Sequence, residues 1–194
     1  PVGCTNTILT KLYIENNQEI PKNIAGLMLS AIISDTVLFR SPTCTETDKK
    51  MAHKLADIAG VDIESYGLDM LKAGADISDL TNDEIVRTDM KEFSEAGQTI
   101  SIGQISVMDT TDVLAKQAEL VAALEALRTA NGYAASYIMV TNILDESTTL
   151  IYSGDVESVV VNAFGKNVKD NAVFLPNTMS RKKQIVPPIL GAMK

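Results

Sequence analysis

The spacing of apolar residues changes near residue 75, and this change constrains the fold more than any other feature. Before it, apolar residues in 24–32 recur at the three- and four-residue spacing of a buried helix face. After it, Ile100, Ile102 and Ile105 stand among polar residues, which is typical of strands. The segment 73–79 between these patterns is small and polar, which predicts a linker.

We therefore expect an α/β protein of two parts. Residues 1–76 are predicted to be mainly helical, and residues 77–194 to form a compact α/β domain. A length of 194 residues suffices for a buried core without disulfides or metal ions.

Capping signals and periodicity predict individual helices in the first part. Ile8, Leu9 and Leu12 follow the rhythm of a buried helix face. Thr45 is a plausible N-cap, with Asp48 three residues later, close to a capping box.

Turn residues divide the second part into strands and helices. Ala96 and Gly97 predict a hairpin turn before the strand that holds Ile100. A long amphipathic helix is expected from Thr110 or Thr111 to Asn131. Shorter apolar runs predict two neighbouring strands, around 137–140 and 150–152, and a helix over 156–164.

Composition excludes several classes of site. One histidine and two cysteines, Cys4 and Cys44, are too few for a zinc finger, and we interpret the cysteines as reduced thiols in a cytoplasmic protein. A net charge of −8 argues against a nucleic-acid-binding surface. No apolar run approaches the roughly 18–20 residues that cross a bilayer, and no signal peptide is visible, so no membrane partner is expected. Glycine-rich phosphate loops are also absent.

Asp35 stands out because a carboxylate at the end of an apolar helix is costly to bury as an isolated charge. It is either a helix-end residue that bonds nearby backbone N–H groups or a ligand for a divalent metal, which prefers oxygen donors. Ser34 and Thr36 could hold such a ligand by hydrogen bonds.

Arg181, Lys182 and Lys183 form a run of cations in an acidic chain. This run is either a solvated basic patch or a clamp for a phosphate oxyanion, since arginine offers a planar fork and lysine a point charge. Lys91, by itself, has the pattern of an ordinary surface lysine.

Several blocks read together resemble the family II, manganese-dependent inorganic pyrophosphatases of the DHH phosphoesterase superfamily. The resemblance covers essentially the whole chain. The blocks are Pro1-Val-Gly-Cys-Thr5, Ile24-Ala-Gly-Leu-Met-Leu-Ser-Ala-Ile-Ile-Ser-Asp35, Ser41-Pro-Thr-Cys-Thr45, Tyr66-Gly-Leu…Met70-Leu-Lys-Ala-Gly-Ala-Asp76 and Ser180-Arg-Lys-Lys-Gln-Ile-Val-Pro187.

The resemblance implies a DHH domain whose C-terminal part is residues 1–76. It also implies a DHH-associated, substrate-binding α/β domain with a mixed sheet in residues 77–194, with the active site in the cleft between the two domains. It implies that Asp35 is a metal ligand. It also implies that Lys91, Arg181 and Lys182 are catalytic residues that contact the phosphates of pyrophosphate, while Lys183 adds supporting charge in substrate binding.

The chain also departs from the family pattern. The family's His-x-x-x-Asp-x-Asp and Asp-His-His motifs are absent, and the chain begins with proline. We expect it to be the C-terminal portion of a longer enzyme and to be inactive alone. The resemblance implies a homodimeric parent, and a regulatory CBS region could lie upstream.

For the parent enzyme, the resemblance implies hydrolysis of pyrophosphate to two phosphates at a two-metal Mn²⁺ centre, with Mg²⁺ accompanying the substrate. Two alternatives remain open. One is an exopolyphosphatase of the same superfamily. The other is a non-catalytic phosphate- or nucleotide-sensing module, which would suit the absence of the histidine motifs.

Overall fold

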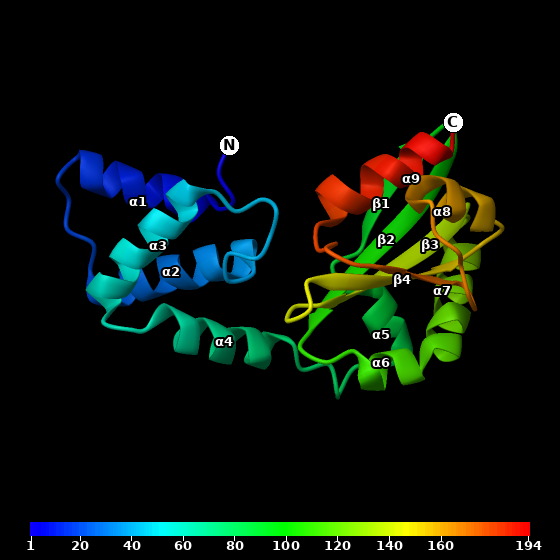
Figure 1. The fold of residues 1–194 in the computed structure, drawn as a ribbon, viewed down its shortest axis with the longest axis horizontal. Helices are drawn as coiled ribbons and strands as arrows, with labels where there is room; N and C mark the ends of the chain where they lie inside the picture. Colours follow the sequence, from blue (N-terminus) through cyan, green and yellow to red (C-terminus); the bar gives the residue numbers. More distant parts are fainter. The chain divides into compact units, whose positions relative to one another are not determined.

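The computed structural model describes all residues from 1 to 194 and divides into two compact units (Figure 1). Unit 1 is Pro1–Gly74 and unit 2 is Ala75–Lys194. The division falls within the small polar segment that the sequence marks as a linker. No helix combines the length and apolar character needed to cross a membrane.

Unit 1 is entirely helical. Its elements are α1 (Thr5–Glu15), α2 (Lys22–Thr36), α3 (Glu46–Ala59) and α4 (Ile63–Gly74). The core is built mainly from the apolar faces of α2 and α3, and it includes Met28, Leu29, Ile32, Ile33, Met51, Leu55 and Ile63.

The N-cap that the sequence predicts for α3 is confirmed. The Thr45 hydroxyl accepts a hydrogen bond from the Asp48 N–H, and the Asp48 side chain accepts one from the Thr45 N–H. This reciprocal capping box satisfies two backbone donors at the start of the helix. Gly60 closes α3 in the left-handed conformation, at φ 70°.

The prediction that Ile8, Leu9 and Leu12 form a buried face of α1 is wrong for this chain. These side chains are 50%, 42% and 48% exposed, and the buried positions of α1 are Thr7 and Thr10. Periodicity identifies an apolar stripe, but it does not say which neighbour covers the stripe. Here α1 turns its threonine side toward the other helices of unit 1.

Unit 2 is an α/β fold, as the sequence predicts, and it is built around one five-stranded sheet. The strands are β1 (Lys91–Glu95), β2 (Gln98–Val107), β3 (Ala135–Asn142), β4 (Ser147–Ser153) and β5 (Ala172–Leu175), and their order in the sheet follows the chain. Only β2 and β3 are parallel; the other neighbours are antiparallel. The sheet is therefore mixed.

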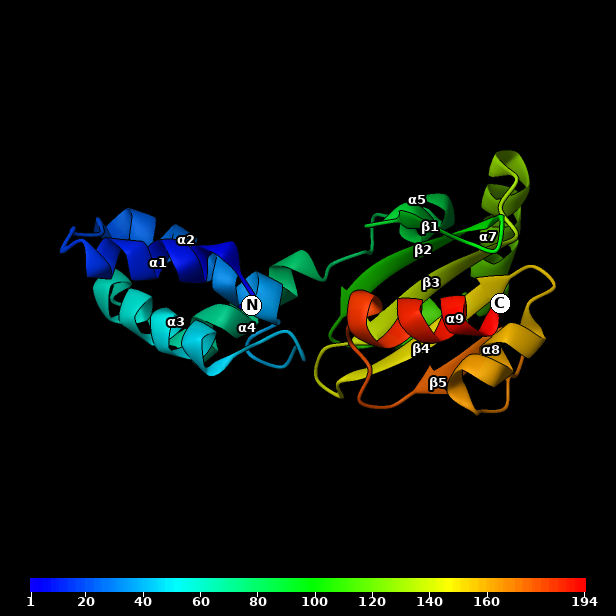
Figure 2. The same cartoon turned by 90° about the horizontal axis from the view of Figure 1, so that it is seen from above.

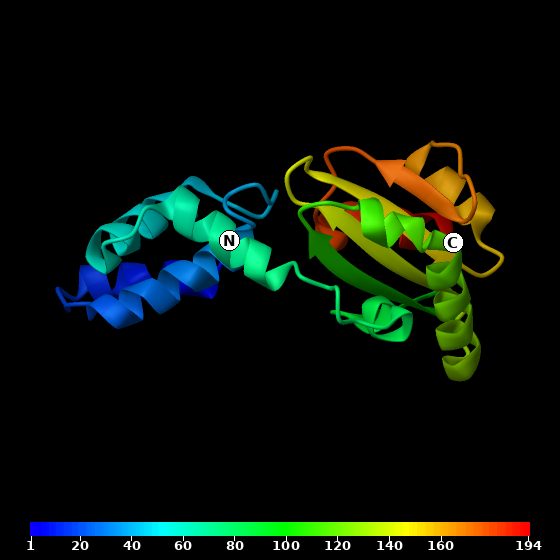
Figure 3. The same cartoon turned by 90° about the horizontal axis from the view of Figure 1, so that it is seen from below.

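Helices cover both faces of this sheet. The helices α5 (Asn82–Arg87), α6 (Thr111–Ala115) and α7 (Gln117–Asn131) contribute to one apolar core, together with Ile105, Ile138 and Val140. The helices α8 (Glu157–Phe164) and α9 (Val186–Ala192) contribute to the second core, on the opposite face. Figure 2 shows α9 lying across the strands on its face, and Figure 3 views the molecule from the side of α6 and α7.

The turn between β1 and β2 is the predicted hairpin, since Ala96 and Gly97 both have positive φ angles, of 50° and 77°. The single long helix expected from Thr110 or Thr111 is instead two helices. The chain leaves the helical path at Lys116, whose φ and ψ are −97° and 17° and whose N–H bonds to Val113 rather than four residues back. Capping signals did not reveal this break.

A close backbone approach joins α5 to β2. A Cβ atom added to Gly103 would lie 2.6 Å from the carbonyl oxygen of Val86 and 3.0 Å from the Cδ1 atom of Ile138. Only glycine fits this position of the strand without displacement of its neighbours.

Candidate functional site

The segment that contains the three adjacent cations is a wide, π-helical turn, η1 (Arg181–Ile185), which leads directly into α9. Two side chains hold it in place. The Ser180 hydroxyl accepts a hydrogen bond from the Lys183 N–H. The Gln184 side chain accepts from the Met179 and Ser180 N–H groups, at 3.0 and 2.9 Å, and donates to the Asn177 carbonyl. Ser180 and Gln184 therefore build the loop on which the cations sit.

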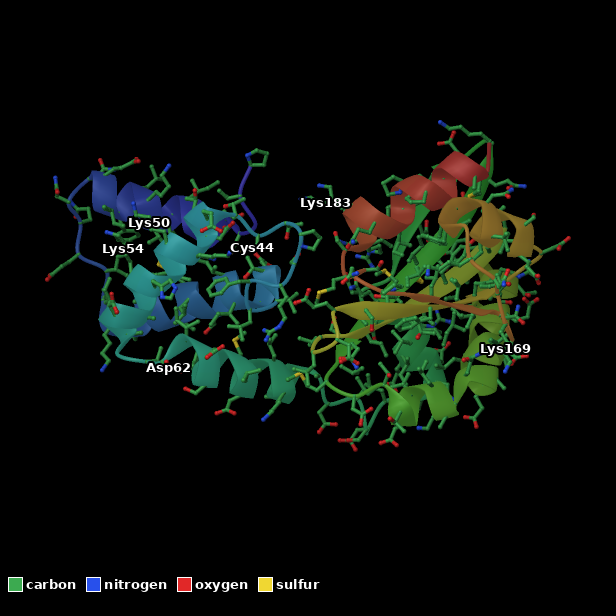
Figure 4. All side chains as sticks on the ribbon, viewed as in Figure 1. Cys44, Lys50, Lys54, Asp62, Lys169 and Lys183 are labelled. Carbon is green, nitrogen blue, oxygen red and sulfur yellow. The ribbon has the colours of Figure 1, made fainter.

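This turn separates the cations into two groups. Arg181 and Ile185 point inward and are buried, whereas Lys182 and Lys183 are exposed. Figure 4 shows the Lys183 side chain projecting outward at the start of the C-terminal helical segment. Single-turn π-helical segments occur often at functional sites, where they re-aim side chains.

Arg181 donates three hydrogen bonds, two to Asp89 just before β1 and one to Ile102 in β2. Its Nη1 atom donates to the carbonyl oxygens of Asp89 and Ile102, the latter at 3.0 Å. Its Nη2 atom donates to the Asp89 carboxylate at 2.9 Å. The Arg181 side chain is only 8% exposed. A buried guanidinium with these partners is well satisfied and rigidly placed.

Lys91 belongs to the same cluster. It opens β1 and pairs across the sheet with Ile102, the residue whose carbonyl oxygen receives Arg181. Its Nζ atom lies 3.9 Å from the second carboxylate oxygen of Asp89. Two of the residues implied by the resemblance, far apart in the sequence, are therefore brought together around one carboxylate.

Asp89 itself was missed by the sequence reasoning. It precedes Lys91 by two residues and lies in the turn between α5 and β1. This spacing was the available signal, but it is too common to single out one aspartate. We define the cation cluster as Lys91, Arg181, Lys182 and Lys183, with Asp89 as its carboxylate.

Asp35 lies in unit 1, near the end of α2, and is exposed. The chain after it turns through three left-handed residues, Val37 to Phe39, with φ between 48° and 68°. The Thr36 hydroxyl donates to the Ile32 carbonyl at 2.6 Å, so it is directed to the backbone rather than to Asp35. The expectation that Thr36 steadies the Asp35 carboxylate is not met.

The thiol of Cys4 lies within hydrogen-bonding reach of the Asp35 carboxylate. Burial of Cys4 raises its pKa, and the Asp35 carboxylate adds to this effect, so that the pKa of the thiol is about 11. Cys4 is therefore a protonated thiol at neutral pH, and neither it nor Cys44 forms a disulfide.

No group of three or more His, Cys, Asp or Glu side chains is placed so that it could hold a metal ion. Asp35 offers a single carboxylate, whereas a divalent ion such as Mn²⁺ takes several ligands.

Asp48 is a fully buried carboxylate that fastens the N-terminal segment to α3. Besides Thr45, it accepts hydrogen bonds from the Gly3 N–H at 2.9 Å and from the Thr7 hydroxyl at 2.5 Å. Burial raises the pKa of Asp48, but the hydrogen bonds from Thr45, Thr7 and Gly3 outweigh that effect and lower it to about 2. Asp48 is thus structural, and it holds Cys4 beside Asp35.

Two pockets in unit 1 are lined by none of the predicted site residues. One, of about 490 Å³, lies between the start of α2 and residues 59–66 and is lined by Lys22, Gly26 and Tyr66 among others. The other, of about 340 Å³, is lined by residues that include Arg40, His53 and Asp62.

Comparison with known sequences gives close relatives over the whole chain. A protein of Bacillus licheniformis, named a probable manganese-dependent inorganic pyrophosphatase, is 50% identical over all 194 residues. Proteins with the same name from Enterococcus faecalis and Brevibacillus brevis are 47% and 50% identical, over 97% and 96% of the chain. The chain spans 60–63% of the length of these three relatives.

Comparison with solved structures agrees. A Methanococcus jannaschii protein, described as a putative family II inorganic pyrophosphatase, is 40% identical to this chain, with a TM-score of 0.89. The match covers 99% of this chain and 65% of that protein. A family model described as the DHHA2 domain matches residues 68–192, which is more than half of the sequence. The chain therefore belongs to the DHHA2 domain family.

Proposed function

We propose that this chain is part of a manganese-dependent inorganic pyrophosphatase, which hydrolyses pyrophosphate to two phosphates. In this proposal the chain supplies the clamp for the substrate phosphates and one metal ligand, Asp35. One observation carries the proposal: Lys91 and Arg181, from opposite ends of unit 2, both lie beside the carboxylate of Asp89. The names of the relatives support the substrate and the metal.

The proposed division of labour follows the two domains. Residues 1–76 are the C-terminal part of a DHH phosphoesterase domain, and residues 77–194 are the DHH-associated domain that holds the substrate. The side chains of Lys91, Lys182 and Lys183 are exposed, and in this proposal they contact phosphate oxygens. Arg181 is held at a fixed position and presents its Nη2 edge beside Asp89.

Phosphoryl transfer places negative charge on equatorial and leaving oxygens, and positioned cations lower its barrier by stabilising that charge. Lys91, Arg181 and Lys182 perform this role in the proposal, and Lys183 contributes to substrate binding. Bound Mn²⁺ would lower the pKa of a water molecule to give the attacking hydroxide. Mg²⁺ would accompany the substrate.

Because the His-x-x-x-Asp-x-Asp and Asp-His-His motifs are absent from these residues, we propose that the 194 residues alone are inactive. The longer protein is proposed to be cytoplasmic and homodimeric, without a nucleic-acid or membrane partner. A regulatory CBS region in its preceding part is compatible with this proposal.

The test is a phosphate-release assay with Mn²⁺ and pyrophosphate, on a protein extended to the length of the relatives and on the 194-residue chain. We expect turnover from the longer protein only. Turnover by the short chain would contradict the proposed dependence on further residues.

The same assay with tripolyphosphate and longer polyphosphates separates the alternatives. Preference for the longer substrates would assign an exopolyphosphatase. Binding of phosphate without turnover of any substrate by the longer protein would assign a non-catalytic sensing module.

A further inference from the structure

We infer that the Asp89 carboxylate is a built-in competitor for the anion that binds the cation cluster, so that a phosphate group binds by displacing it. This inference rests on the proposed phosphate clamp and adds to it the residue that limits its affinity. Two observations carry it, namely where the carboxylate lies and how Arg181 is held, and the backbone of Asp89 decides which substitutions can test it.

The carboxylate lies where an anionic ligand would bind. One of its oxygens accepts a hydrogen bond from Arg181 Nη2 at 2.9 Å, and the other is 3.9 Å from Lys91 Nζ. The Asp89 side chain is 55% exposed, whereas that of Arg181 is 8% exposed. The carboxylate is thus an accessible group attached to a buried guanidinium, and a phosphate oxygen needs the same donors.

Arg181 does not depend on this carboxylate for its position. Its Nη1 atom is held by two backbone carbonyl groups, those of Asp89 and Ile102. If the carboxylate moves away, the guanidinium keeps both of these bonds and exposes the Nη2 hydrogen. Displacement therefore uncovers a pre-positioned donor rather than disordering the site.

The negative charge of Asp89 lowers the affinity of the cation cluster for anions. A carboxylate within 4 Å of two cations cancels part of their field and repels an incoming phosphate. The Asp89–Lys91 pair is exposed on both sides and is worth only a modest free energy. Arg181 loses one of its three hydrogen bonds when the carboxylate leaves, and a phosphate oxygen accepts that bond in its place. The competitor is therefore weak enough for a multivalent anion to displace, yet it lowers the affinity for monovalent anions. Pyrophosphate carries several negative charges, so we expect it to bind the cation cluster more tightly than a monovalent anion does.

The backbone conformation of Asp89 tolerates the substitutions that the test needs. Its φ angle is 42°, in the left-handed region, where asparagine and aspartate are the best tolerated residues after glycine. Asp89→Asn removes the charge but keeps an acceptor for Arg181 and suits the backbone. Asp89→Gly also suits this φ angle and removes the acceptor as well.

The experiment is calorimetric titration of the 194-residue chain with pyrophosphate at low ionic strength, without metal. We expect Asp89→Asn and Asp89→Gly to bind pyrophosphate about five- to tenfold more tightly than the parent chain, with a steeper loss of affinity as salt is added. Asp112→Asn, an exposed position of α6 with the same change in net charge, is the control and should leave the affinity unchanged.

Equal or weaker binding by Asp89→Asn and Asp89→Gly overturns the inference, and so does an equal gain by Asp112→Asn. If the parent chain shows no binding, measurable binding by the Asp89 variants supports it and continued absence of binding overturns it. Thermal melting of each variant shows that the titrated protein is folded. Turnover by the longer protein is measured separately, so failure of the proposed function is distinguishable from failure of this inference.

Discussion

The guanidinium of Arg181 donates a hydrogen bond to the carbonyl oxygen of Ile102, 79 positions earlier in the chain. Ile102 is also the cross-strand partner of Lys91. The register of β1 and β2 therefore sets the spacing between the two cations. A shift of this hairpin by one residue would turn Lys91 to the other face of the sheet.

Arg181→Ala is expected to destabilise unit 2 by about 2–3 kcal/mol, because the substitution leaves the Ile102 carbonyl oxygen without its donor in a buried site. In the longer protein it should also lower kcat/KM for pyrophosphate by orders of magnitude, since a contact with transition-state charge is lost. Urea unfolding of the 194-residue chain and phosphate release by the longer protein measure the two effects.

Lys182→Ala is the matched control for Arg181→Ala, because Lys182 is its exposed neighbour on the same turn. It should lower turnover while changing the stability by less than about 0.5 kcal/mol. Activity of Arg181→Ala within a few-fold of the parent, at a temperature where the protein is folded, would remove Arg181 from the clamp.

The stability of unit 1 is expected to depend on pH through Asp48. Its pKa in the folded protein, about 2, lies below the ordinary value of 3.8. The ionised carboxylate therefore contributes about 2 kcal/mol that is complete above roughly pH 4 and is lost as the pH falls toward 2. Thermal unfolding followed by circular dichroism across this range measures the loss.

Asp48→Asn should flatten this pH dependence and lower the melting temperature at neutral pH. Asp57→Asn, at an exposed position of the same helix, serves as the control. An unchanged acid profile in Asp48→Asn would show that the loss arises elsewhere.

Gly103→Ala is expected to destabilise unit 2 by about 1–3 kcal/mol, since the new methyl group would meet the Val86 carbonyl oxygen at 2.6 Å. Gly191→Ala is the contrasting substitution. Nothing lies within 4 Å of its added Cβ, and alanine favours the helix, so stability should stay equal or rise slightly. Equal effects of the two substitutions in urea unfolding would contradict the close approach of α5 to β2.

Asp35→Asn is expected to lower the pKa of Cys4 in the 194-residue chain, because the neighbouring carboxylate is one of the groups that raise it. With Cys44 replaced by serine, the reaction of Cys4 with a thiol reagent should begin at a lower pH. In the longer protein the same substitution should weaken Mn²⁺ binding. An unchanged metal titration would remove Asp35 from the proposed metal site.

Local sequence signals predicted much of the fold. The Thr45 cap and the Ala96–Gly97 turn depend on interactions within a few residues, and both are found in the structure. The break at Lys116 depends on small changes in backbone angles, which no residue type in this segment indicates. The exposure of Leu12 depends on which elements surround α1, which periodicity alone does not contain.

The same holds for the site: the sequence indicates some of its residues, but not the contacts between distant parts of the chain. The cations were noticeable in the sequence because they interrupt an acidic chain, and the resemblance added Lys91 to them. Neither indicated that Arg181 is buried or that Asp89 lies between Arg181 and Lys91. Those facts arise from a contact across 92 positions, which only the folded chain brings about.

The order of the strands has a consequence for how this region assembles. Because β5 lies at the edge opposite β1, the chain after Leu175 must return across the sheet before Arg181 can reach Asp89. The cation cluster is therefore complete only when the last fifteen or so residues are packed on the sheet. An anion that bridges Lys91 and Arg181 fastens the carboxyl-terminal segment to the first strand, and by mass action its concentration sets how firmly that segment is held.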